Sequence, residues 1–572
     1  MGKNVVILHT SAMFRPLAWP LERLANILLK NEIVQDVDTV FPELAQKKGT
    51  YCYNRIGMYV DSEAWIMESY GFDKFVECIP EVYVLPAKQE IAKHIFSLNP
   101  LVFSLNFLQR MSKSGTYTVA GLPVAAVGLY SEIFGEPGFK SIYRQPKAQL
   151  LNIILAFTFA AYSIFDHFFK VKIKVPNPQT FDLGIDWVFG GGEIRHNRIA
   201  LELADPNENV IVVRRNRTDN YDGSMDGHSV VVFGDQICSL RNAVVFASSA
   251  IHNIGVLTIN LCKIESSIFW RLVTLPVKHA KWQRFFGQYP CRRFWGRDEY
   301  NAEHHLRTHE LRSAGALSVG ISHGIMGWGI IEPQIRFIDF DVYFTFGIGL
   351  YERHYYQYWP KRMRVVPVGS FGMSRDELMN LSAKRPKNIL LFLDPAVDGP
   401  DGLSFGFDLA REFSDRKLLV KIKQDRETAP YYKELIGMLQ NTSLENVIQV
   451  TSDTYALMFQ ARYAISGLST VAAECLQFGL ASWALDLDED TKYVHYREFE
   501  DFCVDCSDQI IARIRGIENN VIRYPRETYR EMIDLSGKII YDVIRREVGL
   551  SEKQPGTIFS LPMGNSIECN NC

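Results

Sequence analysis

A regular alternation of short apolar runs and amphipathic segments between residues 388 and 485 constrains the fold of this chain most strongly. Buried strands are predicted at 389–393, 418–422, 447–450, 463–465 and 483–485. Helices are predicted between them, where apolar residues recur at helical spacing, at 405–413, 431–439, 454–461 and 470–478. Strands and helices that alternate in this way indicate βαβ units, and therefore a parallel sheet covered on both faces.

A second α/β unit is predicted at the N-terminus. Val5 to Leu8 has the pattern of a strand, and the apolar residues of 21–29 recur as they do in an amphipathic helix. His9 would then lie at the carboxyl end of the strand, where doubly wound domains bind their ligands. Short apolar runs in the middle of the chain predict further strands at 210–213, 229–233 and 242–247.

Composition excludes several classes of protein. The 572 residues include 62 Lys and Arg against 65 Asp and Glu, a net charge of −3, so no global positive field exists and we expect no nucleic-acid partner. Ten cysteines are too few for a disulfide scaffold in a chain of this length. Only four apolar residues separate Asn4 from His9, too few for a secretory signal. We therefore expect a cytoplasmic protein.

An uncharged stretch at 148–165, with basic residues on both sides, leaves two alternatives open. It is close to the length of a membrane-spanning helix but is interrupted by polar residues. The strict alternation at 170–175 is typical of a half-exposed strand. The segment 148–174 is therefore either a membrane-contacting element, which would place the protein at the inner face of the cytoplasmic membrane, or a buried helix that leads into an edge strand.

The sequence Ser-Gly-Leu-Ser-Thr at 466–470 predicts a tight turn between a strand and a helix. Ser469 or Thr470 would cap the helix, whose amides and dipole favour a phosphate at this point. Glu474 lies one turn further on and could accept hydrogen bonds from ribose hydroxyls. The alternative is an ordinary N-cap followed by a surface glutamate.

Two further motifs are predicted to meet this helix start. Lys421 and Lys423 share one face of a strand, because alternate side chains do, and could supply the cations for a diphosphate. His323 and Gly324 end an apolar strand in a glycine-rich turn, where backbone could approach a ligand closely. A solvated strand edge and a structural histidine are the respective alternatives.

Neither a metal nor a cofactor is predicted. No Asp-x-Asp pair lies in a credible metal-binding loop, and the pair at 486–488 directly follows a strand. The CxxC pairs at 503–506 and 569–572 are far apart in the sequence. Any nucleotide would be part of a substrate.

Taken in order, these motifs resemble GT-B-type glycosyltransferases of bacterial capsule, lipopolysaccharide and teichoic-acid-like polymer synthesis. The resemblance covers about 315–490 and includes His323-Gly324, the strand-like 342–347, Val-Gly-Ser at 368–370 and Ser-Gly-x-Ser-Thr-x-x-x-Glu at 466–474. It implies two Rossmann-like domains separated by a cleft. Ser469 and Thr470 would contact donor phosphate, Glu474 would contact sugar or ribose hydroxyls, and His323 would lie on the cleft floor.

The resemblance also implies a domain plan and a function. We expect an acceptor-side domain over 1–380 with an insertion at about 140–300, a nucleotide-sugar-binding domain over 381–549, and a polar tail over 550–572. The expected activity is transfer of a sugar from a nucleotide donor to a surface glycan or lipid-linked acceptor, with His323 as first and His9 as second candidate base. An epimerase or polyol-phosphate transferase of this fold, and a non-catalytic assembly subunit, are the alternatives.

One departure from the resemblance concerns the donor. Several such families have His-Pro after the basic strand, whereas this chain has Gln424-Asp425 after Lys423. The identity of the donor and the contact to the leaving group are therefore left open.

Overall fold

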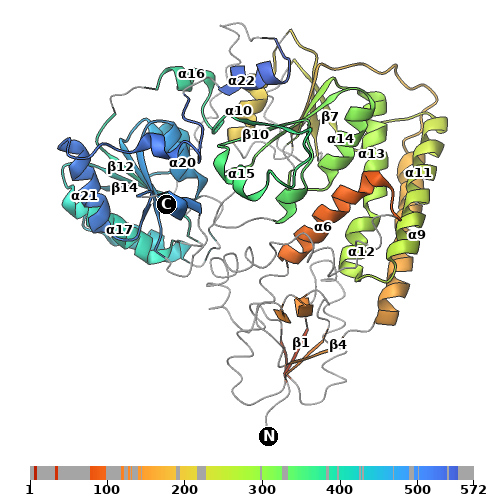
Figure 1. Ribbon diagram of the computed structural model, residues 1–572, viewed down its shortest axis with the longest axis horizontal. Helices are drawn as coiled ribbons and strands as arrows, with labels where there is room; N and C mark the ends of the chain where they lie inside the picture. Colours follow the sequence, from red (N-terminus) through yellow and green to blue (C-terminus); the bar gives the residue numbers. More distant parts are fainter. Residues whose placement is uncertain are drawn as a thin grey trace, which may run out of the picture.

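A computed structural model gives the architecture of the chain (Figure 1). It describes 5–8, 33–35, 78–97, 117–120, 126–128, 130–131, 139–142, 145–187, 194–205, 207–215, 227–296, 299–324, 333–381, 385–395, 398–423, 427, 429, 431–467, 469–487, 495–499, 501–536 and 540–551. These residues form three parallel sheets, and described helices pack on the two larger ones. The predicted α/β class with two Rossmann-like domains is confirmed.

The C-terminal sheet follows the sequence pattern closely. Its strands are β12 (Ile389–Leu393), β13 (Leu418–Ile422), β14 (Val447–Gln449), β15 (Tyr463–Ser466), β16 (Ala481–Leu485) and β17 (Cys503–Val504). Its helices are α17 (Gly399–Glu412), α18 (Tyr432–Asn441), α19 (Thr454–Met458), α20 (Thr470–Gln477) and α21 (Ser507–Glu518). The order β14-β13-β12-β15-β16-β17 makes it doubly wound, with the change of direction between β12 and β15.

A seven-stranded parallel sheet forms the middle of the molecule, in the order β11-β10-β9-β8-β5-β6-β7. Its strands are β5 (Leu183–Trp187), β6 (Val210–Arg214), β7 (Ser229–Val232), β8 (Arg293–Gly296), β9 (Leu317–Ile321), β10 (Val342–Thr345) and β11 (Arg364–Pro367). Four of these strands fall inside the range predicted as an insertion. They are hydrogen-bonded members of the same sheet as β9, so this part of 140–300 belongs to the body of the domain.

The opening strand is confirmed but belongs to a sheet of its own. β1 (Val5–Leu8) pairs with β2 (Ile33–Gln35) and β3 (Tyr117–Ala120), and β3 pairs with β4 (Phe139–Ile142). The predicted helix at 21–29 and His9 lie outside the described residues.

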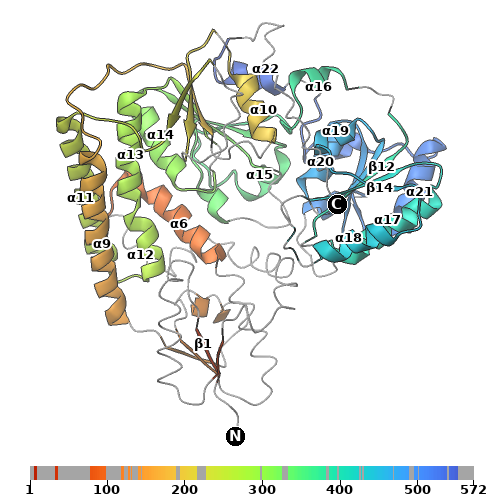
Figure 2. The ribbon, with the colours of Figure 1, turned by 180° about the vertical axis from the view of Figure 1, so that it is seen from behind.

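The chain returns from the C-terminal sheet to the middle one. α22 (Ile540–Glu547) lies next to α10 (Ile194–Leu203), as Figure 2 also shows. Asp534 N donates to Phe346 O at 2.7 Å, and Gly349 N donates to Glu531 O at 3.1 Å. By packing, the segment after about 529 therefore belongs with the seven-stranded sheet, although the predicted C-terminal domain extends to 549.

Two predicted strands are wrong. The run 242–247 lies inside α11 (Leu240–Leu261), where Ala243, Ala247 and Ala250 face inward at helical spacing. In 170–175 only Val171 forms a bridge, to Cys238, after α9 (Gln145–Phe168) ends. Ile173 is fully exposed and no further ladder forms, so an alternating pattern alone did not make a strand here.

Candidate functional site

The start of α20 is built as the sequence predicts. Ser469 is the N-cap, and its hydroxyl accepts a hydrogen bond from Val471 N at 3.4 Å. Gly467 N donates to Phe392 O at 3.1 Å, and Ala472 N donates to Ser469 O at 3.2 Å. These three amides are thus used within the protein.

The structure brings the His323-Gly324 turn directly against this helix start. β9 delivers the turn from the seven-stranded sheet, and Thr470 begins α20 in the C-terminal sheet. A Cβ on Gly324 would lie only 2.8 Å from Thr470 Oγ1, so glycine allows the close approach. Two motifs that are far apart in the sequence, from two different sheets, therefore meet at one point.

A buried core continues across this junction. Ala472 and Leu476 of α20 belong to the same buried cluster as Ile321 of β9 and Phe344 of β10. The two sheets therefore share apolar packing behind the Gly324–Thr470 contact, which stabilises their relative position at the site.

The backbone of the His323 turn is held by buried polar groups. His323 N donates to Glu299 Oε1 at 2.6 Å, and Glu299 is fully buried. Ser322 Oγ donates to Gly324 O at 2.5 Å, and Tyr351 OH contacts both groups. His323 as a whole is partly exposed, and its ring lies edge-on to that of Tyr300, with the ring centroids 5.6 Å apart.

Glu474 has a structural role that differs from the predicted contact with ligand hydroxyls. It is 1% exposed, and its Oε1 accepts hydrogen bonds from Ser370 Oγ at 2.6 Å and from Tyr455 OH at 2.9 Å. The carboxylate therefore joins α20 to the Val-Gly-Ser turn and to α19. Burial with two hydroxyl donors makes Glu474 part of the packing rather than a surface glutamate.

Gln477 adds a second link to the same turn. Ser370 N donates to Gln477 Oε1 at 2.6 Å, and Gln477 Nε2 donates to Ser370 O at 3.3 Å. Gly369 has φ of +78°, a left-handed conformation that glycine adopts without strain. The predicted Val-Gly-Ser turn is thus bound to the second half of α20 through Glu474 and Gln477.

Lys421 and Lys423 contact different groups of the protein. Lys421 Nζ donates to Ser452 O at 2.5 Å on the β14 side, and burial lowers the pKa of this lysine. Lys423 Nζ lies 2.9 Å from Asp394 Oδ2 on the β12 side and is half exposed. Of the two, Lys423 lies nearer to the point between β12 and β15, and a joint contact of both lysines with one diphosphate stays a prediction.

Two aspartates that sequence reasoning missed lie at that point. Asp398, just before α17, accepts a hydrogen bond from Asp394 N at 2.6 Å through its Oδ2. A Cβ on Gly467 would collide with the Asp398 carboxyl oxygens. The space beside Gly467 is therefore filled by a protein carboxyl.

The ionisation of Asp398 is shifted into the neutral range. Burial raises its pKa to about 7, the hydrogen bond from Asp394 N and the charge of Lys423 oppose the shift, and the Asp394 carboxylate adds to it. A carboxyl with this pKa between Gly467 and Lys423 changes the local charge near physiological pH.

Asp398→Asn is expected to flatten the pH dependence of stability. The folded-state pKa lies above the ordinary 3.8, so the contribution of Asp398 is fully present below that pH and is lost as pH rises through about 7. The wild-type melting temperature should fall between pH 5.5 and 8.5 by several degrees more than that of Asp398→Asn. Asp401→Asn, an exposed change in the same helix, should follow the wild type; equal slopes in all three proteins would contradict the assignment.

A sequence signal for the missed residues existed. Asp394 follows a buried strand directly, and Asp398 precedes a Gly-Pro helix start four residues later, at the carboxyl edge where ligands of doubly wound sheets bind. Glu299 and Tyr455 had no such signal, because their partners are distant in sequence.

Three residues named above cannot be placed. His9, Gln424 and Asp425 lie outside the described residues, as do 325–332 and 488–494, which follow two strand ends near the site. The predicted cleft and the role of His9 as second base therefore stay predictions.

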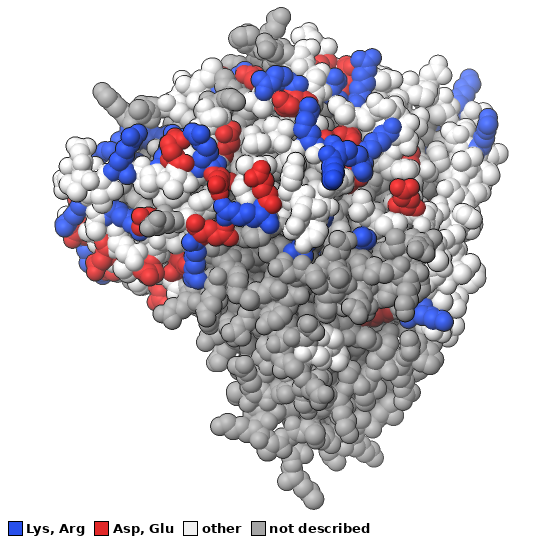
Figure 3. Space-filling model, in the orientation of Figure 1, with Lys and Arg blue, Asp and Glu red and all other residues white. Residues whose placement is uncertain are grey.

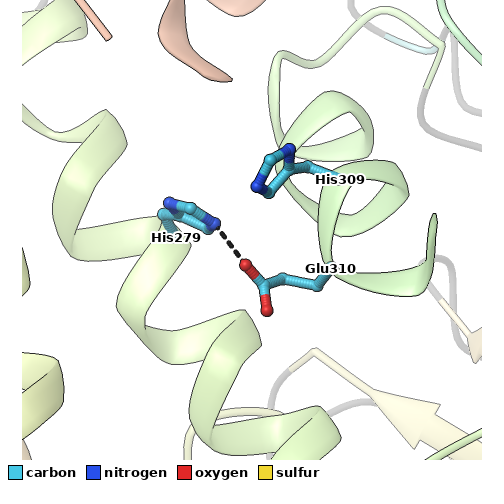
Figure 4. A group of neighbouring side chains, drawn as sticks. All are labelled: His279, His309 and Glu310. Atoms are coloured by element: carbon cyan, nitrogen blue, oxygen red, sulfur yellow. Dashed lines mark hydrogen bonds and ion pairs between the residues drawn. The ribbon is translucent and has the colours of Figure 1, made fainter. Parts of the chain in front are cut away.

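One group of possible metal ligands occurs among the described residues, away from this site. His279 of α13 (Leu275–Gln288) faces His309 and Glu310 of α14 (Glu303–Ser313), with the ligand atoms within 4.8 Å of one another (Figure 4). His279 Nε2 lies 2.6 Å from Glu310 Oε1, and His279 Nδ1 lies 3.1 Å from Tyr83 OH. The hydrogen bonds give the group a structural role between the two helices, and the expectation that no metal is required stays a prediction.

The sheets and the site define an α/β protein in which two doubly wound parallel sheets meet at a histidine-glycine turn and a helix N-terminus. No protein-family model matches the chain, and no curated protein matches it.

Solved structures show low-level similarity to this chain. A UDP-N-acetylglucosamine 2-epimerase from Rickettsia bellii is 11% identical over 64% of this chain and 96% of its own, with a TM-score of 0.37. The wall teichoic acid polymerase TagF is 10% identical over 71% and 99%, with a TM-score of 0.39. MurG from Acinetobacter baumannii is 11% identical over 64% and 99%, with a TM-score of 0.34. At these values the activity must be argued from the site itself.

Proposed function

We propose that this protein transfers a sugar from a nucleotide-activated donor to a surface glycan or a lipid-linked acceptor. We also propose that it acts in the cytoplasm, at the inner face of the cytoplasmic membrane. The observation that carries the proposal is the contact of Gly324 with Thr470, which sets the turn that contains His323, from one doubly wound sheet, against a helix N-terminus of the other. Ligands of such sheets bind at this carboxyl edge.

The donor would be held mainly by the C-terminal sheet. Negative charge develops on the departing phosphate during glycosyl transfer and needs donors already in place. Lys423 is half exposed, and the N-terminal end of α20 has a favourable dipole for an anion. Because Asp398 fills the corner at Gly467, the phosphate would lie nearer to Thr470 and Lys423 than the sequence suggested.

The acceptor hydroxyl would lose its proton to His323. The backbone of His323 is anchored by Glu299 while the residue as a whole is partly exposed, an arrangement suited to a base that must reach a substrate oxygen within about 3 Å. No metal or cofactor takes part in this proposal, and the nucleotide is a substrate.

One observation favours the non-catalytic alternative. The carboxyls of Glu474 and Asp398 are engaged inside the protein, at two places where a donor-binding protein would need groups for its ligand. A carbohydrate-assembly subunit of this fold would keep the packing and not turn over a nucleotide sugar. An epimerase or polyol-phosphate transferase would use the same pocket with a different co-substrate.

Nucleotide binding separates these proposals. We expect one of UDP, CDP, CMP, GDP and ADP to raise the melting temperature by several degrees, and Lys423→Gln or Thr470→Val to remove most of this increase, because each deletes one proposed phosphate contact. Lys417→Gln is the matched control, since Lys417 is exposed and lies just before the same strand, at its opposite end.

The outcomes are distinct. Loss of the shift in the two site variants, with retention in the control, supports the donor site. The donor site would be refuted, and the assembly subunit favoured, if no nucleotide changed the melting temperature. An equal change in all variants would also refute the proposed donor site. If the nucleotide binds, product analysis without an acceptor distinguishes an epimerase from a transferase.

A further inference from the structure

The outer flank of the molecule formed by α9 and α11 is the largest concentration of exposed apolar side chains in the described part of the chain. The two helices pack side by side as an antiparallel pair: Asn152, near the start of α9, donates to Cys262 O at 2.9 Å, and Val171 pairs with Cys238 at the other end. Figures 1 and 2 both show them outside α12 (Ser266–Val273) and α13.

Of the 21 exposed large apolar side chains among the described residues, 15 lie between 150 and 173 or between 240 and 259. Phe157 is 74% exposed and Ile259 is 80% exposed. Such a continuous patch is unusual on a protein that only meets water. We refer to it as the α9–α11 face.

Polarity is reversed in α9. Asn152, Ser163 and His167 are fully buried, whereas Ile154, Phe157 and Phe165 point outward. Arg284 of α13 lies 2.9 Å from His167 Nδ1, and burial together with the Arg284 charge lowers the pKa of this histidine to about 4. A helix that buries polar groups and exposes phenylalanine is suited to an apolar surrounding on its outer side.

The rim of the face is basic. The segments 143–175 and 236–264 contain seven lysines and arginines and a single acidic residue, Asp166, which is paired with Arg284. Asp235, one position before the second segment, pairs with Lys170 at 3.0 Å and removes one of these positive charges. The chain as a whole has a charge of −3, so the positive charge is local. Figure 3 shows this flank as nearly continuous white, with blue atoms near its two ends.

Two helices here are long and apolar enough to cross a membrane by length and composition: 149–168 and 240–261. Their inner faces are occupied, because Asn152 bonds to the loop after α11 and Arg284 bonds to His167 and Asp166. Only one side of the pair is open. Helices with one apolar side and basic ends lie in the plane of a membrane interface.

We propose that the α9–α11 face is a membrane-docking surface that lies in the interface of a bilayer containing anionic lipid. Apolar side chains such as Phe157 and Ile259 would enter the acyl boundary, and Lys172 and Lys174 would meet anionic headgroups. A second copy of the chain fits less well, because a two-fold contact would bring two basic rims together. The proposal does not depend on the reaction that the protein catalyses.

Vesicle flotation with the full-length protein tests this proposal. The wild type should float with vesicles of phosphatidylcholine and phosphatidylglycerol, weakly with phosphatidylcholine alone, and less in 500 mM than in 50 mM NaCl. The triple variant Phe157→Gln/Phe165→Gln/Ile259→Gln should lose at least ~10-fold in partitioning, since about 0.8 kcal/mol is associated with each buried CH₂. Lys172→Gln/Lys174→Gln should lose the preference for anionic lipid.

Met379→Gln/Val521→Gln is the matched control, because both residues are exposed and apolar but lie elsewhere. It should float like the wild type. Wild-type protein that stays unbound with every vesicle, or a triple variant that floats equally well, would overturn the proposal. A wild-type dimer that the triple variant makes monomeric, without vesicle binding, would identify a subunit interface instead and equally overturn it. Nucleotide binding is measured by the melting temperature and membrane docking by flotation, so the failure of one proposal leaves the other untouched.

Discussion

Replacing Glu474 with alanine is expected to destabilise the protein by about 2–5 kcal/mol, because it leaves two buried hydroxyl donors without their acceptor and opens a cavity. The donors are Ser370 Oγ and Tyr455 OH, at 2.6 and 2.9 Å from the same carboxylate oxygen. Chemical denaturation, followed by tryptophan fluorescence, measures the change. The effect should be among the largest of any single substitution near the site.

Two further variants define what the carboxylate does. Glu474→Gln keeps an acceptor oxygen at the same place and should recover much of the loss. Glu434→Ala, an exposed change on α18, should stay within about 0.5 kcal/mol of the wild type. If Glu474→Ala were as stable as the wild type and only lost its response to nucleotide, Glu474 would be a ligand contact and its structural role would be refuted.

The helix start at Ser469 could be predicted from the sequence, whereas the contacts of Glu474 could not. Ser469 at the N-cap and the boundaries of β12 and β13 followed from local patterns, because a buried strand and a capped helix are each defined within a few residues. The structural role of Glu474 depends on its hydrogen bond with Ser370, which lies 104 positions away in the sequence. No local pattern contains that partner.

Lysines on one strand face illustrate the same limit. Alternation correctly places Lys421 and Lys423 on one side of β13, but flexible side chains then turn to different neighbours, Ser452 and Asp394. Register determines which face a residue occupies, and the loops that follow the adjacent strands determine what its charged end meets. Those loops could not be placed from the sequence.

The strand predicted at 242–247 failed for another reason. Short apolar runs fit a buried strand and a segment of helix equally well, and only their length separates the two. Here the run continues to Leu261, and inward-facing alanines allow α11 to pack closely on its neighbours. For the uncharged segment 148–165 the sequence left two alternatives, membrane contact and a buried helix. The helix forms, but its outer side is exposed.

His323→Gln is expected to lower the turnover of a nucleotide-sugar donor by ~10²–10⁴-fold, the usual contribution of a general base, while leaving nucleotide binding near the wild-type level. This expectation rests on the proposed transferase activity. Glutamine fills a similar volume, and the backbone bond from His323 N to Glu299 is kept, so the turn against Thr470 should remain in place. Release of free nucleotide from the donor selected by the thermal panel measures the rate.

A structural and a chemical role for His323 differ in three observables. A base gives a pH–rate profile with an acidic limb that His323→Gln lacks, an unchanged KM and an unchanged melting temperature, because only proton transfer is lost. A positioning histidine would instead change KM, stability or both. His252→Gln, an exposed histidine on α11 that lies outside the proposed site, should behave as the wild type in all three. Unaltered turnover in His323→Gln would transfer the role of base to another residue, with His9 next to be tested, while leaving the meeting of the two sheets at Gly324 and Thr470 intact.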